Sequence, residues 1–250
     1  MAAMCGRFVV AGAAGDLVAL FDVDLPADDL PSPSWNIAPT DTVSIVLDSL
    51  PKGPDAGTEP VRRLEAARWG LVPSWAKDPS SGPPAINARI ETVTEKRQFS
   101  AAAHKRRAIV PASGYYEWRT VDGVKSPYFI HLPDGEIFAF AGLYEWWRNP
   151  AAATDASDRW LLSTTILTQD ATGDLAQIHD RMPVFLTADL ADEWLDPHEP
   201  ATDELLAAVG LAGVEVAGSA AFHRVANAVG NVRNNGPELI EAVAEGPDAP

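Results

Sequence analysis

Short runs of apolar residues, most of them rich in β-branched side chains, dominate the hydrophobic pattern of the chain. Runs of this kind, bounded by Gly, Pro, Asn or Asp, predict buried or half-buried strands. We expect strands at these positions: 8–10, 43–47, 64–71, 108–111, 128–132, 137–143, 161–167 and 220–225. The dipeptides Asp122-Gly123 and Asp134-Gly135 predict tight turns between neighbouring runs.

Helical patterns are fewer and shorter than the strand patterns. We predict helices over 16–21, 91–103, 190–195 and 203–209, the second capped by Thr92 or Thr94. The segment 151–158 is polar without periodicity, which indicates a surface insertion. The sequence shows no strand–helix–strand alternation, no internal repeat and no convincing linker, so the pattern predicts a single compact α+β domain.

Composition is that of an ordinary globular protein, with 46% hydrophobic and 22% charged residues among 250. A single cysteine excludes an internal disulfide framework and is typical of a reducing compartment. The N-terminus has no basic stretch followed by a long apolar core, and no apolar run approaches the roughly 20 residues of a membrane helix. We expect a cytoplasmic monomer without contact to a membrane.

Charge is distributed unevenly along the chain. The net charge of −16 argues against a nucleic-acid partner, but residues 62–119 hold 11 basic and 5 acidic residues, a local charge of +6. The remainder, with 8 basic and 30 acidic residues, carries −22. Because salt screens charges beyond about 8–10 Å, the local field decides whether a polyanion binds. The alternative is a solvated helix face over 96–107.

The only cysteine, Cys5, stands near the chain start in Met4-Cys5-Gly6-Arg7-Phe8. If the residues ahead of it are removed, Cys5 carries an α-amine and a thiol on neighbouring carbons. Such an aminothiol adds to an aldehyde first through nitrogen and then through sulfur, closing a thiazolidine ring. The reference pKa values, about 8 for the amine and about 8.5 for the thiol, leave reactive fractions of both at neutral pH. The alternative is a small buried apolar side chain.

Four further clusters place polar residues among Trp, Pro and Gly. They hold Asn36, Asn87 with Arg89, Glu117, and His179 with Arg181. Each cluster also has a structural explanation. Glu117 fits an exposed strand position, His179 fits a turn cap, and Asn87 fits a left-handed turn position.

Six motifs, taken together and in order, resemble the SRAP (SOS response-associated peptidase) family. They are Met-Cys-Gly-Arg-Phe, Trp-Asn-Ile-Ala-Pro-Thr, Trp-Gly-Leu-Val-Pro-Ser-Trp, Asn-Ala-Arg-Ile-Glu-Thr, Pro-Ala-Ser-Gly-Tyr-Tyr-Glu-Trp and His-Asp-Arg-Met-Pro, between residues 5 and 232. The resemblance implies a compact antiparallel β-barrel-like core with flanking helices. It also implies a protein that shields abasic sites in single-stranded DNA through a covalent link from its cysteine, without a metal or an organic cofactor.

The resemblance implies a catalytic role for four residues: Cys5, Asn87, Glu117 and His179. Glu117 is expected to act as the general acid that expels water when the imine forms, with its pKa raised toward neutrality by desolvation beside an aromatic pair. His179 is expected to assist opening of the sugar ring or proton transfer. Asn87 is expected to orient the amine.

We expect the DNA contacts to come from Arg7, Asn36, Trp75, Arg89 and Arg181. Arg89 and Arg181 suit bidentate phosphate contacts, and Arg7 is expected to face the backbone phosphates. Trp75 is expected to stack on unpaired bases, with Trp35 and Trp69 as further candidates. Of these, Trp69 fits the core better.

This sequence departs from the family pattern at its start. The family's cysteine follows the initiator methionine, whereas residues 1–4 precede Cys5 here. We expect either translation from Met4 or removal of a leader at 1–4, followed by an SRAP domain over 5–237 and an acidic tail over 238–250.

Two other functions use the same residues. A thiol peptidase would pair the Cys5 thiolate with the His179 imidazole, oriented by Asn87 or Glu117. A non-covalent single-stranded DNA binder would need only the Trp and Arg residues, with Cys5 incidental.

Overall fold

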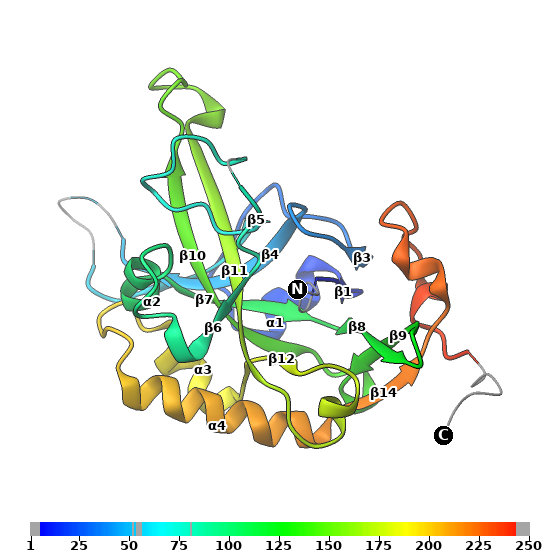
Figure 1. Cartoon of the computed structure of the whole chain (residues 1–250). Helices are drawn as coiled ribbons and strands as arrows, with labels where there is room; N and C mark the ends of the chain where they lie inside the picture. The colour runs from blue at the N-terminus through cyan, green and yellow to red at the C-terminus, as the bar shows by residue number, and fades with distance from the viewer. Residues whose placement is uncertain (1–5, 52, 54–56, 81, 244–250) are drawn as a thin grey trace.

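The computed structural model describes residues 6–51, 53, 57–80 and 82–243 (Figure 1). Cys5 therefore lies outside the described residues, and every expectation for it stays a prediction. The first described residue, Gly6, leads directly into the first strand, β1.

Five strands form an antiparallel sheet in the order β14-β9-β8-β1-β3. They are β1 (Phe8–Val10), β3 (Ser34–Ile37), β8 (Gly114–Val121), β9 (Val124–His131) and β14 (Ala221–Arg224). The turn between β8 and β9 has Asp122 at φ 49° and Gly123 at φ 81°, which is the two-residue hairpin that the sequence predicts.

A second sheet closes into a five-stranded barrel. Its strands are β4 (Thr42–Ser49), β5 (Val61–Trp69), β7 (Arg107–Ala112), β10 (Phe138–Arg148) and β11 (Trp160–Asp170). They run in the order β11-β10-β7-β4-β5, and β5 returns to β11 through a parallel pairing of Thr164 with Trp69. The predicted α+β domain with a barrel-like core is confirmed. The parallel closure is the difference from a purely antiparallel barrel, and it removes the open sheet edges.

Short strands extend the barrel at its margins. They are β2 (Leu25–Pro26), β6 (Asn87–Arg89), β12 (Arg181–Pro183) and β13 (Phe185–Leu186). β6 pairs in parallel with β11, and β12 pairs with β11 in the antiparallel direction. Both strands pair with β11 near its last residues. The motif of Asn87 and the motif of His179 therefore lie at the same end of β11.

Aromatic rings join the first sheet to the barrel. Phe8 and Tyr115 of the first sheet approach Phe140 of β10, with ring centroids 6.3 Å and 5.9 Å apart, and Phe138 stacks on Phe185 at 4.7 Å. Edge-to-face pairs of this kind add about 0.5–1.5 kcal/mol each to the burial of their area. They fix β1 and β8 relative to β10.

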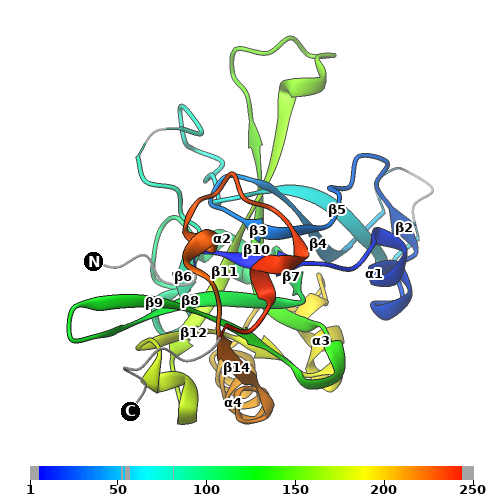
Figure 2. The ribbon, with the colours of Figure 1, turned by 90° about the vertical axis from the view of Figure 1, so that its right-hand side faces the viewer.

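Helices flank the sheets, as Figures 1 and 2 show. The α-helices are α1 (Ala14–Leu20), α2 (Ser100–Lys105), α3 (Ala188–Leu195) and α4 (Asp203–Ser219). Single 3₁₀ turns are η1 (Ile90–Thr92), η2 (Pro133–Gly135), η3 (Ser157–Arg159), η4 (Gly173–Gln177), η5 (Asn227–Gly230) and η6 (Pro237–Ile240). No helix among the described residues is long and apolar enough to cross a membrane.

Two helix predictions differ from the structure. The helix expected over 91–103 is wrong, because this stretch forms η1, a series of turns and only then α2. The helix expected to end at 209 continues to Ser219. Gly210 and Gly213 lower its intrinsic propensity, but a Cβ at Gly213 would lie 2.7 Å from Gln169 Nε2 and 3.2 Å from Phe185 N. The glycine lets α4 pack closely on the barrel.

The structured body continues past the boundary expected at residue 237. Residues 238–240 belong to η6, Leu239 is 1% exposed, and the backbone N–H of Val243 donates to Arg224 O at 3.0 Å. The described part of the predicted acidic tail, 238–243, thus packs on β14. The acidic composition of this segment gave no indication that Leu239 is buried.

A two-stranded arm rises from the barrel where β10 and β11 run beyond their other partners. It comprises residues 145–162 and stands at the top of Figures 1 and 2. Its tip contains the polar insertion expected at 151–158. On one side, Trp147 Nε1 donates to Ala76 O at 2.7 Å, so the loop at 72–80 supports the arm.

Candidate functional site

The start of the described chain lies against β8. Phe8 pairs with Tyr115 and Val9 with Gly114, and the backbone N–H of Tyr116 donates to Arg7 O at 2.9 Å. A Cβ at Gly114 would lie 2.4 Å from the Phe129 ring and 2.6 Å from Ile130 O, so only glycine allows β9 to approach this closely. The start of the described chain is therefore held beside the first three residues of β8.

Glu117 follows Tyr116 on β8 and is 2% exposed. In the antiparallel register it stands opposite Tyr128 of β9, and strand alternation turns it to the same face as Tyr115. The expectation of an exposed strand residue is wrong, because a carboxyl at this depth is removed from bulk water. Burial of a carboxyl is the condition that the proposed general acid requires.

Asn87 and Arg89 occupy alternate positions of β6 and turn to the same face of that strand. Asn87 is half-buried and pairs in register with Ile166, whereas Arg89 is exposed and pairs with Thr168. Ala88 between them is buried at 2%. β6 thus presents an amide beside the protein interior and a guanidinium toward solvent.

A bidentate ion pair joins the motif of Asn87 to that of His179. Arg181 donates through Nη1 to Glu91 Oε1 at 2.7 Å and through Nη2 to Glu91 Oε2 at 2.9 Å. The same guanidinium also contacts Asp170 and donates to Thr168 O at 2.7 Å. Burial raises the pKa of Glu91, but hydrogen bonds and charge from Arg181 lower it, and the net shift is downward. The pair therefore stays ionised at neutral pH.

Arg181 is only 6% exposed, and carboxylates and a carbonyl already engage both of its Nη groups. Burial lowers the pKa of Arg181, but Glu91 and Asp170 outweigh it and the net shift is upward. A phosphate would have to compete with both carboxylates for this guanidinium. The predicted DNA contact stays a prediction, while the structural role of Arg181 is plain.

The ring of His179 has a partner for each state of Nδ1. This nitrogen lies 3.1 Å from the backbone N of Arg181 and 2.9 Å from Asp180 Oδ1. Without a proton it accepts from Arg181 N–H, and with a proton it donates to Asp180, since one nitrogen cannot do both at once. An imidazole that keeps its orientation in both states suits proton transfer.

Asn36 holds the segment 229–234 against β3. It is 3% exposed, and its Nδ2 group points to three backbone carbonyls: those of Val229 at 3.3 Å, Asn231 at 3.1 Å and Asn234 at 2.8 Å. Its Oδ1 accepts from Arg7 Nη1 at 2.7 Å. The structure gives Asn36 the role of positioning Arg7, and direct contact of Asn36 with DNA stays a prediction.

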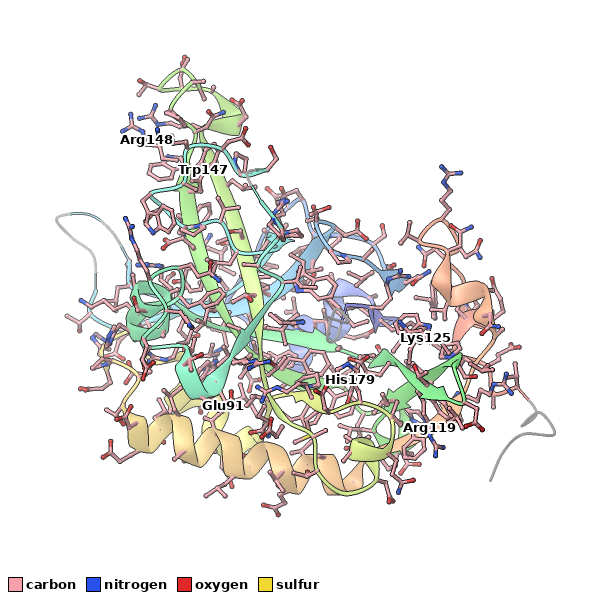
Figure 3. The ribbon with its side chains drawn as sticks, in the orientation of Figure 1. Glu91, Arg119, Lys125, Trp147, Arg148 and His179 are labelled. Atoms are coloured by element: carbon pink, nitrogen blue, oxygen red, sulfur yellow. The ribbon has the colours of Figure 1, made fainter. Side chains whose placement is uncertain are left out.

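Arg7 also contacts its other neighbours in this cluster. Its Nη1 donates to Val229 O at 2.8 Å, and its guanidinium lies 6.0 Å from the ring centre of Trp118. Lys125 approaches the same ring at 5.4 Å. Figure 3 labels Lys125 and Arg119 on the β8–β9 hairpin, and Lys125 adds a second cation to the Arg7–Trp118 cluster.

The three tryptophans considered as stacking platforms differ clearly in their solvent exposure. Trp69 is fully buried, as expected of a core residue, and its Nε1 donates to Ile86 O at 3.0 Å. Trp35 is half-buried. Trp75 is 55% exposed, with the Arg97 guanidinium 4.6 Å from its ring centre. Of the three, Trp75 is the one available to a base.

Trp69 also connects β1, the strand that follows Cys5, to β6, the strand that carries Asn87. Its ring meets Phe8 of β1 edge-on at 4.9 Å, and it bonds to the residue before Asn87. One side chain thus spans from the strand after Cys5 to the strand of Asn87. The residue pattern gave no signal for this contact.

The basic segment at 62–119 is less available than its sequence suggests. Five of its arginines are engaged within the protein: Arg62 with Asp48 and Asp192, Arg63 with Glu65, Arg106 with Glu145, and Arg68 and Arg107 with backbone carbonyls. The exposed cations are Lys77, Arg89, Lys96, Arg97 and Lys105. The helix face expected over 96–107 is not formed as such, since α2 covers only part of it.

Arg89 offers the sharpest test of the basic surface. We expect Arg89→Ala to weaken binding of intact single-stranded DNA and to flatten the dependence of log K on log salt by roughly one unit, because one phosphate contact is lost. Arg63→Ala, which removes a cation already paired with Glu65 at 2.5 Å, is the control. Salt titrations of affinity measure both. An unchanged slope in Arg89→Ala would remove Arg89 from the DNA path.

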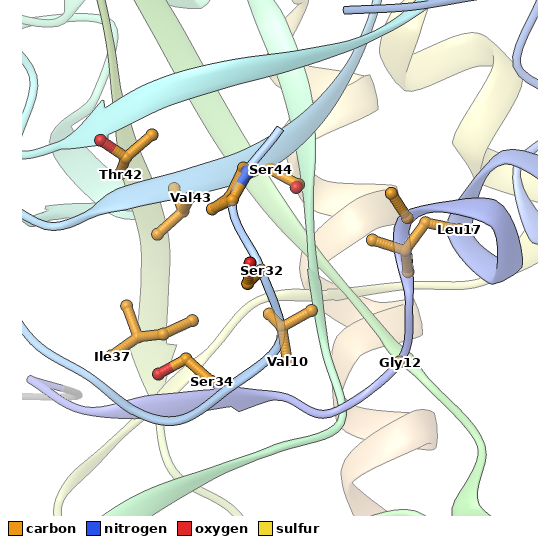
Figure 4. A pocket seen from close by; sticks show the side chains of 11 residues that line it. Val10, Gly12, Leu17, Ser32, Ser34, Ile37, Thr42, Val43 and Ser44 are labelled. Carbon is orange, nitrogen blue, oxygen red and sulfur yellow. The ribbon is translucent and has the colours of Figure 1, made fainter. Parts of the chain in front are cut away.

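One cavity near the start of the described chain is too small for a nucleotide. It lies between β1, α1 and β4, as Figure 4 shows, and is lined by Val10, Leu17, Ile37 and Val43 among others. Its volume is about 20 Å³. That volume holds about one water molecule. Within the described ranges, no three His, Cys, Asp or Glu side chains gather to hold a metal ion.

Comparison with known proteins agrees with this geometry. The profile of the family described as "SOS response associated peptidase (SRAP)" matches residues 4–232. The Abasic site processing protein YoqW of Bacillus subtilis is 37% identical over 242 residues, 96% of this chain and all of that protein. The Abasic site processing protein YedK of Escherichia coli is 31% identical over 244 residues, 96% of this chain and all of that protein.

A solved structure from Bacteroides thetaiotaomicron superposes with a TM-score of 0.75 at 21% identity, over 96% of this chain and all of that one, which indicates the same fold. The family profile spans most of the chain, and two relatives exceed 30% identity over nearly its whole length. The chain therefore belongs to the SRAP family.

Proposed function

We propose that this protein processes abasic sites in single-stranded DNA by forming a covalent link from Cys5 to the sugar. One observation carries the proposal. The described chain start is bonded to β8 at Tyr116, and the next residue of that strand is the buried carboxyl of Glu117. Cys5 precedes Arg7 by two residues in the sequence, and the proposal brings its amine to this strand. The names of the relatives YoqW and YedK support the substrate.

The proposed reaction balances with one water released. The neutral amine of Cys5 adds to the C1′ aldehyde of the opened sugar and forms a carbinolamine. Glu117 donates a proton to the departing hydroxyl, which leaves as water, and the resulting iminium nitrogen returns its proton to the Glu117 carboxylate to give the imine. The thiol sulfur then adds to the imine carbon, and its proton ends on nitrogen. Ring closure gives a thiazolidine.

The surrounding groups support these steps. His179 sits where Arg181 and Asp180 orient its ring in either state of Nδ1, which suits it to open the sugar ring. Asn87 is half-buried on β6 and suits orientation of the amine. Arg89 and the Trp75–Arg97 pair offer an exposed cation and a stacking surface for the flanking nucleotides. The chemistry requires Cys5 as the first residue of the mature chain.

Replacement of the thiol tests the proposal. We expect the protein that begins at Cys5 to form a heat-resistant adduct with abasic single-stranded DNA without a reducing agent, and none with intact DNA. Cys5→Ser retains the amine but forms no thiazolidine, so it is expected to give at most an imine that needs reductive trapping. Denaturing gel electrophoresis with and without borohydride measures the difference. Equally stable adducts from Cys5→Ser would refute the thiazolidine.

A further inference from the structure

We propose that the solvent-facing side of the arm is a second, non-covalent contact for single-stranded nucleic acid. This contact lies apart from Glu117 and His179 and needs no covalent step. It would hold the strand that leaves the abasic site. The inference rests on three side chains: Trp146, Arg148 and Trp160.

The register of the arm gathers these side chains on one face. Trp146 pairs with Leu162 and Arg148 with Trp160. Because directly paired residues and alternate residues share a face, the two indoles and the guanidinium lie together. Trp146 is 41% and Trp160 is 51% exposed, and Arg148 is exposed as well. Figure 3 labels Arg148 on the arm.

The opposite face of the arm already has its partner. Trp147 is 5% exposed and donates a hydrogen bond to Ala76 O in the loop at 72–80. This loop and Trp147 supply the support that a two-stranded ribbon requires. Trp146 and Trp160 are therefore not needed to anchor the arm, yet they keep large apolar surfaces in water. Exposed apolar clusters of this kind mark contact sites.

The size of the face favours nucleobases over a protein. A tryptophan contributes about 150–250 Å² when it is buried, so the exposed halves of two tryptophans supply roughly 200 Å². A stable protein interface needs about 800 Å² from each partner, several times more. One or two stacked bases match the smaller area.

The charge of Arg148 and the neighbouring Trp75–Arg97 pair also favour a single-stranded nucleic acid. Arg148 forms no ion pair within the part of the chain that the structure describes, so its guanidinium is available to a phosphate. The loop that supports the arm also carries Trp75 with Arg97 stacked on it at 4.6 Å. Both faces of this region thus combine indole with guanidinium, the set that binds single strands.

The length of β11 sets how far a strand must reach. Trp160 lies six residues before Ile166, which pairs with Asn87 of the site. At about 3.3 Å per residue the two positions are about 20 Å apart. A stacked strand advances about 3.4 Å per nucleotide, so about six nucleotides span the gap. Only a strand with that extension on one side of the lesion can reach both positions.

The test uses the double variant Trp146→Thr/Trp160→Thr, because threonine retains a high strand propensity. Leu211→Gln, which removes an apolar side chain 74% exposed on α4, is the control. Affinities are measured for single strands that carry an abasic analogue without an aldehyde, extended by about 3 or about 12 nucleotides toward either end. Because this probe cannot crosslink, the result is independent of the proposed covalent chemistry.

We expect the double variant to bind the long probe about 5- to 100-fold more weakly in one direction of extension, since a stacked base contributes that much. Its affinity for the short probes, its crosslinking of a short abasic strand and all affinities of Leu211→Gln are expected to match the unmodified protein. Equal affinities of the double variant and the unmodified protein at every length would overturn the proposal. A change in self-association by sedimentation, with unchanged DNA affinity, would assign the face to a second copy instead.

Discussion

Glu117→Gln is expected to slow formation of the covalent adduct by about 10²–10⁴-fold while affinity for intact DNA changes little. That range is what a positioned general acid contributes. Glutamine keeps the shape and hydrogen-bonding capacity of the side chain but cannot give up a proton at neutral pH. Since Glu117 is 2% exposed, it has little surface to offer DNA directly. The measurement is a crosslinking time course with an abasic single strand.

Two comparisons make this result specific. Glu65→Gln makes the same chemical change on β5, where the carboxylate pairs with Arg63, and is expected to leave the crosslinking rate unchanged. A thiol peptidase would depend on Cys5 and His179 rather than on Glu117. Hydrolysis of general peptides by the unmodified protein, with normal crosslinking in Glu117→Gln, would therefore contradict the assignment of the general acid.

Trp69→Ala is expected to lower the free energy of unfolding by about 3–5 kcal/mol, the usual cost of removing a buried Trp from a core. Trp69 is fully buried, meets Phe8 edge-on and bonds to Ile86 O, so its loss opens a cavity between β1 and β6. Chemical denaturation measures the change. A loss below about 1 kcal/mol would mean that Trp69 does not hold β1 and β6 together.

Trp75→Ala is the matched variant, six residues further along the chain. With 55% of the residue exposed, its removal is expected to change stability by no more than about 0.5 kcal/mol. It is expected instead to weaken binding of single-stranded DNA about 5- to 100-fold, since a base loses its stacking surface. Equal DNA affinity in Trp75→Ala and the unmodified protein would remove Trp75 from the DNA path.

Local pattern predicted most strands but not how they join. The β-branched runs at 43–47 and 108–111 lie within β4 and β7, because buried strands need such residues whatever their partners. The parallel closure of the barrel by Trp69 and Thr164 depends on residues almost one hundred positions apart. No local signal encodes such a pairing. The close approach of α4 at Gly213 to Gln169 and Phe185 likewise involves residues distant in sequence.

In the site, too, local motifs predicted the residues but not the contacts between residues distant in the sequence. Motif context singled out Glu117, Asn87 and His179, and the register of β6 and β12 on β11 brings the latter two motifs together. Sequence reasoning missed Glu91, which binds Arg181, although it stands two residues after Arg89 in a motif already noted. Its position inside the Asn-Ala-Arg-Ile-Glu-Thr motif was the available signal. The roles of Asn36 and Arg181 within the protein depend on partners distant in the sequence, so no local sequence signal could indicate them.

Intact mass spectrometry of the purified protein, with and without an abasic single strand, tests the central claim most directly. The account predicts a protein that begins at Cys5. It also predicts an adduct with the summed mass of protein and DNA less one water, since imine formation expels one water and ring closure expels none. The adduct should survive denaturation without reduction. A protein that retains residues 1–4 yet gives the same adduct, or one that begins at Cys5 and gives none, would contradict it.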